Sequence, residues 1–236
     1  MEKVVIAGGT SGMGLATAKT LSKRNYKVII LGRDPEKLGE ALKQIGPNSD
    51  GKCVDATDAE ALKQAMSEIG PFDHLVVALS GGKGIGLFRE LDLEDLRKGF
   101  DGKFFPQLQA AQAALPHIAV NGSITFITSI SAQSKATGTA GLGAINGALE
   151  IMIPTLAKEL KPLRVNAVAP GVINTTWWDF MPPEKKEETF DQYKKIIPAG
   201  RIGEPEDVAK MILTFIENTY ITGQVIAVDG GLSLGQ

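Results

Sequence analysis

The sequence is poor in residues that bind metal ions or form disulfides. It has one cysteine, Cys53, and only two histidines, His74 and His117, which lie far apart in the chain. A single cysteine excludes an intramolecular disulfide and suits a reducing compartment, so a cytoplasmic location is expected. One cysteine and two distant histidines also provide no ligand cluster, and no metal site is predicted.

A strong charge of either sign is also missing. The 236 residues include 25 lysines and arginines and 27 acidic residues, which gives a formal net charge of −2. This balance provides no electrostatic reason to expect a nucleic acid or an anionic membrane as a partner. Residues 104–134 carry no charged side chain, but Gln, Asn, Pro and Gly interrupt them, which indicates a buried core. The chain enters an apolar run directly after Met-Glu-Lys, so no signal peptide is expected.

Two common functional motifs are absent, whereas a different glycine-rich turn is present near the N-terminus. No G-x-S-x-G elbow of a hydrolase occurs, and no Lys-Ser/Thr pair follows the first glycines as a P-loop requires. The apolar run 4–7 ends in the pattern G-x-x-x-G-x-G, formed by Gly8, Gly12 and Gly14, before helical spacing begins. A strand that turns through glycines into a helix N-terminus offers unpaired N–H groups to a phosphate. A strand–helix turn without any ligand has the same pattern.

Short apolar runs alternate with stretches of helical spacing along most of the chain. Strands are predicted at 4–7, 27–31, 52–54, 75–79, 123–128, 165–168 and 225–228, and helices at 15–21, 35–45, 58–69, 92–115, 140–160 and 206–217. Apolar strands separated by helices predict an α/β fold with a parallel sheet covered on both faces. Ligands of such sheets bind beyond the carboxyl ends of the strands.

One long stretch, residues 174–202, has no predicted strand or helix of this series. It is rich in Lys and Glu and contains the pair Trp177 and Trp178. An insertion of this length is typical of a lid or a binding loop. The alternative is a solvated surface helix, which the charge run 184–188 favours, whereas the tryptophan pair favours a lid.

Five motifs, in order, resemble those of the short-chain dehydrogenase/reductase family. The first turn is similar to T-G-x-x-x-G-x-G with Ala7 in place of Thr, residues 55–58 are similar to D-V-T-D, and residues 170–175 match P-G-x-x-x-T. Residues 200–209 and 222–231 are close to the C-terminal signatures of the family. The resemblance covers the whole chain. It implies one doubly wound, Rossmann-type domain over residues 1–236, a bound NAD or NADP, and a homodimer or homotetramer.

The resemblance also implies the cofactor contacts. Asp55 would hold the adenine ring and Thr175 the nicotinamide carboxamide. Gly32 holds the place of the acid that selects NAD, and Arg33 follows it, which favours NADP(H) because Arg attracts a 2′-phosphate; the alternative for Arg33 is a solvated turn residue. Asp34 is interpreted as a helix cap. The implied contacts are Gly8, Thr10, Ser11, Gly12, Met13, Gly14, Arg33, Asp55, Ala78, Asn146, Pro170, Gly171 and Thr175.

The resemblance implies that most of the family's catalytic tetrad of Asn, Ser, Tyr and Lys is replaced. Ser129 stands at the Ser position, Leu142 and Asn146 stand at the Tyr and Lys positions, and Lys103 stands at the Asn position. Residues 77–80 likewise replace the family's N-N-A-G element. Leu142 cannot protonate the alkoxide that hydride delivery leaves, and losing a general acid costs about 10²- to 10⁴-fold in rate.

Two functions therefore remain open. Lys103 either points into the site as a desolvated acid or extends to the surface, and Ser129 either binds the developing oxyanion or satisfies local backbone. The first function is an NADP(H)-dependent oxidoreductase acting on a small, largely apolar carbonyl or alcohol under the tryptophan lid, with Tyr193 as a second candidate acid. The alternative is a catalytically silent NADP(H)-binding sensor or regulatory protein. The retained Arg33 and Thr175 favour the enzyme.

Overall fold

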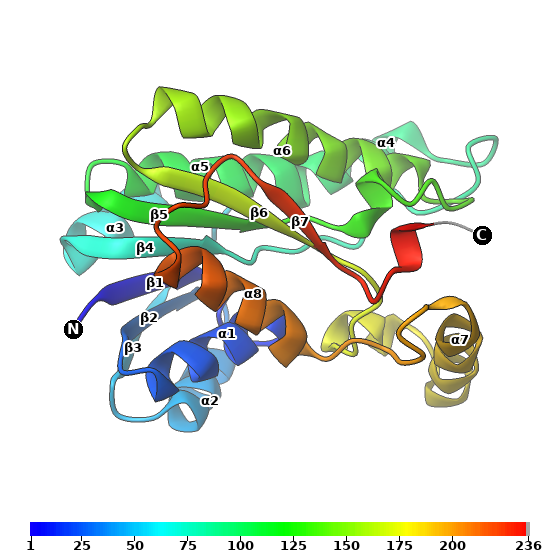
Figure 1. The fold of residues 1–236 in the computed structure, drawn as a ribbon, viewed down its shortest axis with the longest axis horizontal. Helices are drawn as coiled ribbons and strands as arrows, with labels where there is room; N and C mark the ends of the chain where they lie inside the picture. The colour runs from blue at the N-terminus through cyan, green and yellow to red at the C-terminus, as the bar shows by residue number, and fades with distance from the viewer. Residues whose placement is uncertain (235–236) are drawn as a thin grey trace.

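The computed structural model describes residues 1–234 and contains a seven-stranded parallel sheet with the strand order β3-β2-β1-β4-β5-β6-β7 (Figure 1). The strands are β1 (Lys3–Ala7), β2 (Lys27–Gly32), β3 (Ser49–Cys53), β4 (Phe72–Val77), β5 (Ile118–Ile127), β6 (Arg164–Pro170) and β7 (Val225–Val228). The predicted Rossmann-type α/β fold is therefore confirmed. The strand order reverses between β1 and β4, and ligands of such sheets bind at this switch point.

Helices cover both faces of the sheet. They are α1 (Gly12–Lys23), α2 (Pro35–Ile45), α3 (Ala59–Ile69), α4 (Leu93–Gly99), α5 (Phe105–Ala114), α6 (Ala140–Glu159), α7 (Pro183–Ile196) and α8 (Pro205–Glu217), with short helices η1 (Phe100–Phe104), η2 (Ile130–Ala132), η3 (Thr176–Phe180) and η4 (Leu232–Leu234). Side chains of α3, α5 and α6 pack on one face, and those of α1, α2 and α8 pack on the other. α7 lies beyond the carboxyl ends of the strands, at the right of Figure 1.

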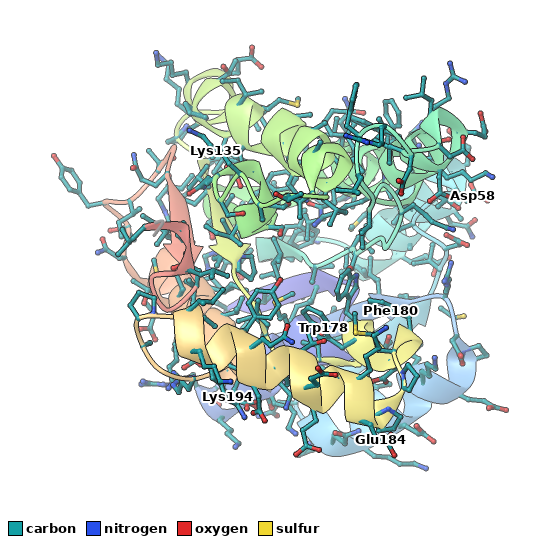
Figure 2. The ribbon with its side chains drawn as sticks, turned by 90° about the vertical axis from the view of Figure 1, so that its right-hand side faces the viewer. Asp58, Lys135, Trp178, Phe180, Glu184 and Lys194 are labelled. Atoms are coloured by element: carbon teal, nitrogen blue, oxygen red, sulfur yellow. The ribbon has the colours of Figure 1, made fainter. Side chains whose placement is uncertain are left out.

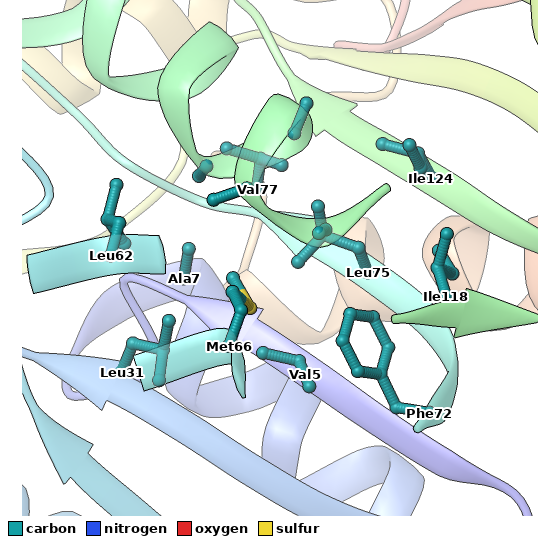
Figure 3. Packing of buried hydrophobic residues seen from close by; sticks show 14 of the residues in the cluster. Val5, Ala7, Leu31, Leu62, Met66, Phe72, Leu75, Val77, Ile118 and Ile124 are labelled. Atoms are coloured by element: carbon teal, nitrogen blue, oxygen red, sulfur yellow. The ribbon is translucent and has the colours of Figure 1, made fainter. Parts of the chain in front are cut away.

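The core is built from alternate residues of the central strands. In β1, Val5 and Ala7 join the cluster beneath α3 and α5, while Val4 and Ile6 join the cluster beneath α1 and α8. Figure 3 shows Val5 and Ala7 beside Met66 of α3. Successive side chains of a strand point to opposite faces, so a strand buried on both faces must be apolar at every position.

Side-chain caps fix the starts of several helices. The Oδ1 atom of Asp34 accepts hydrogen bonds from the backbone N–H groups of Glu36 and Lys37, at 3.0 and 3.1 Å. Asp58 and Asp92 cap α3 and α4 in the same way. These bonds satisfy N–H groups that have no partner within the helix. The interpretation of Asp34 as a cap is confirmed.

The structure corrects the extents of three predicted strands. β3 begins at Ser49 rather than 52, since an edge strand paired with β2 alone needs no apolar run. β4 spans Phe72–Val77 rather than 75–79, so His74 lies inside the strand, where its Nδ1 atom is 2.8 Å from the Ser123 hydroxyl. β5 begins at Ile118, before an irregular register that separates two parts of its pairing with β4.

Two helical predictions are also corrected. The single helix expected at 92–115 is divided by η1, a π-helix in which the N–H group of Phe105 donates to the carbonyl oxygen of Phe100. The stretch 174–202 is not irregular, because it contains η3 and α7. The charge run 184–188 lies in α7, so its interpretation as a surface helix is confirmed.

The helix α6 is long and apolar enough to cross a membrane, the one such helix among residues 1–234. A core helix of an α/β fold passes the same test. α6 contacts β6, and its residues Ile145, Leu149 and Ile153 are buried.

Candidate functional site

The first turn lies at the switch point of the sheet and requires glycine at two positions. Gly8 has a φ of +86°, and a Cβ atom there would lie 2.7 Å from the carbonyl oxygen of Ala78, just beyond β4. A Cβ atom at Gly14 would collide with the carbonyl oxygen of Gly8. Side chains at either position would push the turn away from β4. The sequence-predicted residues Gly8, Gly14 and Ala78 therefore lie together.

The N-terminus of α1 is open to a ligand. Ser11 stands at the N-cap position, but its side chain makes no capping hydrogen bond, and the helix begins at Gly12 and Met13. The first N–H groups of a helix have no partner within it, and they carry the positive end of the helix dipole. The residues present therefore fit the pyrophosphate of a dinucleotide.

The end of β2 forms a second part of the site. A Cβ atom at Gly32 would collide with the Cγ2 atom of Thr10, so an acidic side chain at position 32 has no room unless Thr10 moves. Arg33 is exposed. The Oδ1 atom of Asp55 accepts hydrogen bonds from the backbone N–H and the hydroxyl of Thr57, each at 2.9 Å. These bonds, and to a smaller extent the charge of Arg33, lower the pKa of Asp55.

The loop after β6 faces the first turn. The side chain of Thr175 lies 3.6 Å from the position that a Cβ atom of Gly12 would occupy, and its hydroxyl accepts a hydrogen bond from the N–H group of Trp177. A Cβ atom at Gly171 would lie 2.7 Å from Asp229, so Pro170 and Gly171 hold this loop against the end of β7. A pocket of about 350 Å³ lies here, lined by residues that include Gly12, Thr175 and Lys186.

Lys103 is buried in η1 and does not extend to the surface. Its side chain is 9% exposed, and its Nζ atom donates a 3.1 Å hydrogen bond to the carbonyl oxygen of Thr128, at the end of β5. Burial lowers the pKa of Lys103 to about 8, and the negative charge of Glu150 opposes this shift. The structure thus holds a lysine with a near-neutral pKa against the residue before Ser129.

Ser129, Leu142 and Asn146 meet around Ser131. The Ser129 hydroxyl accepts a 3.2 Å hydrogen bond from the N–H group of Ser131, so it satisfies local backbone as one of the two alternatives expected. The proton of this hydroxyl is still available for a hydrogen bond to a ligand. The Nδ2 atom of Asn146 donates to the carbonyl oxygen of Leu142 at 2.8 Å and to the Ser131 hydroxyl at 3.3 Å. The buried Oδ1 atom of Asn146 has no partner within residues 1–234.

Comparison with known proteins places the chain in a family. A family model described as enoyl-(acyl carrier protein) reductase matches residues 7–233. The curated carbonyl reductase family member 4 of Xenopus laevis is 35% identical, over 99% of this chain and 99% of that protein. The chain belongs to the short-chain dehydrogenase/reductase family. It is therefore an oxidoreductase of the short-chain dehydrogenase/reductase type.

Solved structures of this family have the same fold. A small-chain dehydrogenase in complex with NADPH is 32% identical, with a TM-score of 0.86 over 99% of each chain. A short-chain type dehydrogenase/reductase from Mycobacterium ulcerans is 28% identical, with a TM-score of 0.89 over 99% of this chain and 90% of the other.

An aromatic cluster follows Thr175 in the loop after β6 and reaches α7. The ring of Trp178 packs edge-on against Phe190 of α7, at 5.4 Å between centroids, and against Tyr193 at 6.4 Å. The indole N–H group of Trp178 donates to the carbonyl oxygen of Ile173 at 2.9 Å, and that of Trp177 donates to Gly81 at 3.4 Å. Figure 2 shows Trp178 beside the exposed helix α7. Tyr193 belongs to this cluster.

Sequence reasoning missed three polar residues that support the site. Gln107, one helical turn after Lys103, donates from Nε2 to the carbonyl oxygens of Leu79 and Ile127, which joins the ends of β4 and β5. Thr128 donates from its hydroxyl to Glu150, at 2.9 Å. The available signal was spacing: Glu150 follows Asn146 by four residues, and residues four apart share a helix face.

Proposed function

We propose that this protein is an NADPH-dependent reductase of a small carbonyl compound, with a proton-transfer site rebuilt around Lys103 and Ser129. The observation that carries the proposal is the buried Lys103, whose pKa is about 8 and whose Nζ atom is bonded to Thr128. A general acid works best when its pKa lies near the working pH. The Nζ atom of this buried lysine reaches the end of a central strand, where groups with a shifted pKa serve catalysis in enzymes of this fold.

The chemistry that NADPH supplies when bound is a hydride. The protein's residues have three tasks around it. The open N-terminus of α1 binds the pyrophosphate, Thr175 orients the nicotinamide, and Lys103 holds the proton that the reduced oxygen needs. An ammonium group has three N–H donors, and the bond to Thr128 uses one of them. The Ser129 hydroxyl donates a hydrogen bond to the same oxygen and keeps its proton.

Two further residues replace the tyrosine and lysine of the family in this proposal. Leu142 stands at the tyrosine position and leaves that side of the site apolar. Asn146 stands at the lysine position, and its unpartnered Oδ1 atom accepts a hydrogen bond from a ribose hydroxyl of the cofactor. A buried acceptor without a partner costs about 1–3 kcal/mol, which such a bond would offset.

The preference for NADP(H) rests on Arg33 and Gly32. The exposed guanidinium of Arg33 stands at the end of β2, and Gly32 provides no carboxylate to repel a 2′-phosphate. Arg binds phosphate with two parallel hydrogen bonds. The collision of any Cβ atom at Gly32 with Thr10 adds a steric reason against an acid at that position.

The remaining parts of the proposal concern the substrate and the assembly. Residues 174–202 form a lid, and Trp177 and Trp178 in this lid cover the site. Their aromatic rings favour a small, largely apolar substrate. Phe105 on α5 and Ile151 on α6 expose apolar side chains, 49% and 77% accessible, and a cytoplasmic homodimer or homotetramer would cover them.

The test is NADPH consumption over a panel of small carbonyl compounds, beside NADPH binding measured by fluorescence. Lys103→Met is expected to lower kcat/KM by about 10²- to 10⁴-fold without weakening NADPH binding. Lys98→Met, one helical turn earlier and exposed, is the matched control. Binding without turnover over the whole panel would instead favour the NADP(H) sensor, which the replacement of the tyrosine by Leu142 supports.

A further inference from the structure

A carboxylate reaches the same peptide unit that holds Lys103. The Thr128 carbonyl oxygen accepts from Lys103, while the Thr128 hydroxyl donates to Oε1 of Glu150, on α6. The second carboxylate oxygen of Glu150 accepts a 3.0 Å hydrogen bond from Nε2 of Gln133. Thr128 is buried, with 3% of its surface exposed, and Lys103 is 9% exposed, whereas the carboxylate of Glu150 is half-buried, so water has little access to the lysine end of this connection.

Other charged groups around η1 have different partners. Asp101, on η1 itself, is exposed to solvent. Asp95, on α4, forms a 3.1 Å ion pair with Lys83. On α6 the carboxylate of Glu150 acts on the Lys103 ammonium and favours its charged form.

We propose that Glu150 is a positioning residue for Lys103: its carboxylate anchors Thr128, the acceptor of the lysine, and balances the charge of the buried ammonium. The inference rests on the proposed role of Lys103 as the acid. Glu150 does not pass protons to Lys103, because the connection runs through a backbone carbonyl, which has no proton to give. Its effect is electrostatic and geometric: the two groups form no direct ion pair, but the charge of Glu150 acts on a buried ammonium, where water screens it less than at the surface.

In the family, the paired tyrosine and lysine lie on one helix, at the positions of Leu142 and Asn146. Here the two paired groups lie on two elements, Glu150 on α6 and Lys103 on η1. Leu142, Asn146 and Glu150 follow one another at intervals of four residues along α6, so they share one face of the helix. The lysine comes from η1 instead. A carboxylate on α6 and a lysine on the π-helix η1 thus bind the same residue, Thr128, at the end of β5.

The test is a direct titration of Lys103 by NMR in protein labelled with [¹³Cε]lysine, with the signal assigned by its loss in Lys103→Met. Glu150→Gln keeps the size and the acceptor oxygen but removes the charge. The midpoint of Lys103 is expected to fall by roughly 0.5 to 1 pH unit. Glu159→Gln, at the exposed end of the same helix, is the matched control and leaves the midpoint in place.

The kcat/KM pH profile with NADPH, measured on the same variants, separates the two proposals. A midpoint that falls together with the kinetic profile supports both. A midpoint that falls without a change in the profile keeps the role of Glu150 and rejects Lys103 as the acid. An unmoved midpoint in Glu150→Gln overturns the inference, whatever the activity.

A second variant covers a failure of Glu150→Gln to fold. Thr128→Val removes the hydroxyl that binds one carboxylate oxygen, so Glu150 is held by Gln133 alone, on the exposed side, and is drawn away from Lys103. The Lys103 midpoint is then expected to fall, by less than in Glu150→Gln. If it stays at the wild-type value in Thr128→Val, the inference is rejected on that variant alone.

Discussion

At the scale of single residues, Lys103 is held in a protonation state that costs stability. Its pKa falls from 10.5 to about 8 on burial. Because the folded state binds the proton less tightly than the unfolded state, the cost is fully present below pH 8 and disappears as the pH rises toward 10.5. One pKa unit corresponds to about 1.4 kcal/mol, so the cost at neutral pH is about 3 kcal/mol.

Replacing this lysine should therefore stabilise the protein. We expect Lys103→Met to raise the free energy of unfolding at pH 7 by up to about 3 kcal/mol, with the gain shrinking between pH 8 and 10.5. Urea unfolding at a series of pH values measures this difference. A destabilised variant at pH 7, or a gain that grows with pH, would contradict the stated cost of burial.

In the proposed function, Arg33 provides the preference for NADP(H). In Arg33→Ser, the loss of a charge-assisted hydrogen bond worth about 1.5–3 kcal/mol should weaken NADPH binding roughly 10- to 100-fold and leave NADH binding unchanged. Fluorescence titration with both nucleotides measures this, with the exposed Arg24→Ser as control. Equal weakening for NADPH and NADH would show that Arg33 does not contact the 2′-phosphate.

At this scale the sequence predicts the role of a residue well when that role depends on the local backbone. It predicts the role poorly when it depends on a contact with a residue distant in the chain. Gly8 and Gly14 are indicated by their spacing alone, because the turn they permit is local. The inward orientation of Lys103 was left open, since a lysine on a helix is compatible with either direction. Glu150 was missed because its partner, Thr128, is 22 residues away in sequence.

At the scale of elements, the sequence predicts most helices but not their irregularities. Capping residues and prolines mark the ends of α2, α3 and α8, and these were found. The π-helix η1 was not, although Gly99, Gly102 and Pro106 lie in the run from Leu93 to Ala114, because such residues indicate an irregular helix without specifying its type. β3 was misplaced since an edge strand with the sequence Ser-Asp-Gly-Lys-Cys has no apolar pattern.

The packing of α7 depends on Trp178 more than on the hydrophobicity of the helix itself, because α7 has no buried residue. We expect Trp178→Ala to release α7 and to increase trypsin cleavage at Lys185–Lys195 about tenfold or more, a local loss of about 1.4 kcal/mol. The fully exposed Tyr220→Ala serves as control. Cleavage at the wild-type rate would mean that other contacts hold the helix.

At the scale of the whole molecule, the outer surfaces of α5 and α6 lie on one side of the sheet, the upper side in Figure 1. If these surfaces join copies of the chain, a charge placed among them should separate the copies. We expect Ile151→Glu to convert a dimer or tetramer into monomers, measured by light scattering after size-exclusion chromatography. A monomeric wild-type protein would exclude the proposed assembly.

The π-helix constrains the length of the chain as well as its composition. A residue in an α-helix turns the chain by about 100°, so removing one from η1 would rotate α4 by that angle relative to α5. If α5 kept its place, Gly99 would lose its close packing against Ile145 and the Lys83 carbonyl. If α4 kept its place, Lys103 would lose its hydrogen bond to Thr128. A Cβ atom at Gly102 meets nothing within 4 Å, so Gly102→Ala is expected to fold normally, whereas deletion of Gly102 is not. The fold is therefore expected to tolerate an added side chain in this segment and not the loss of a residue from it.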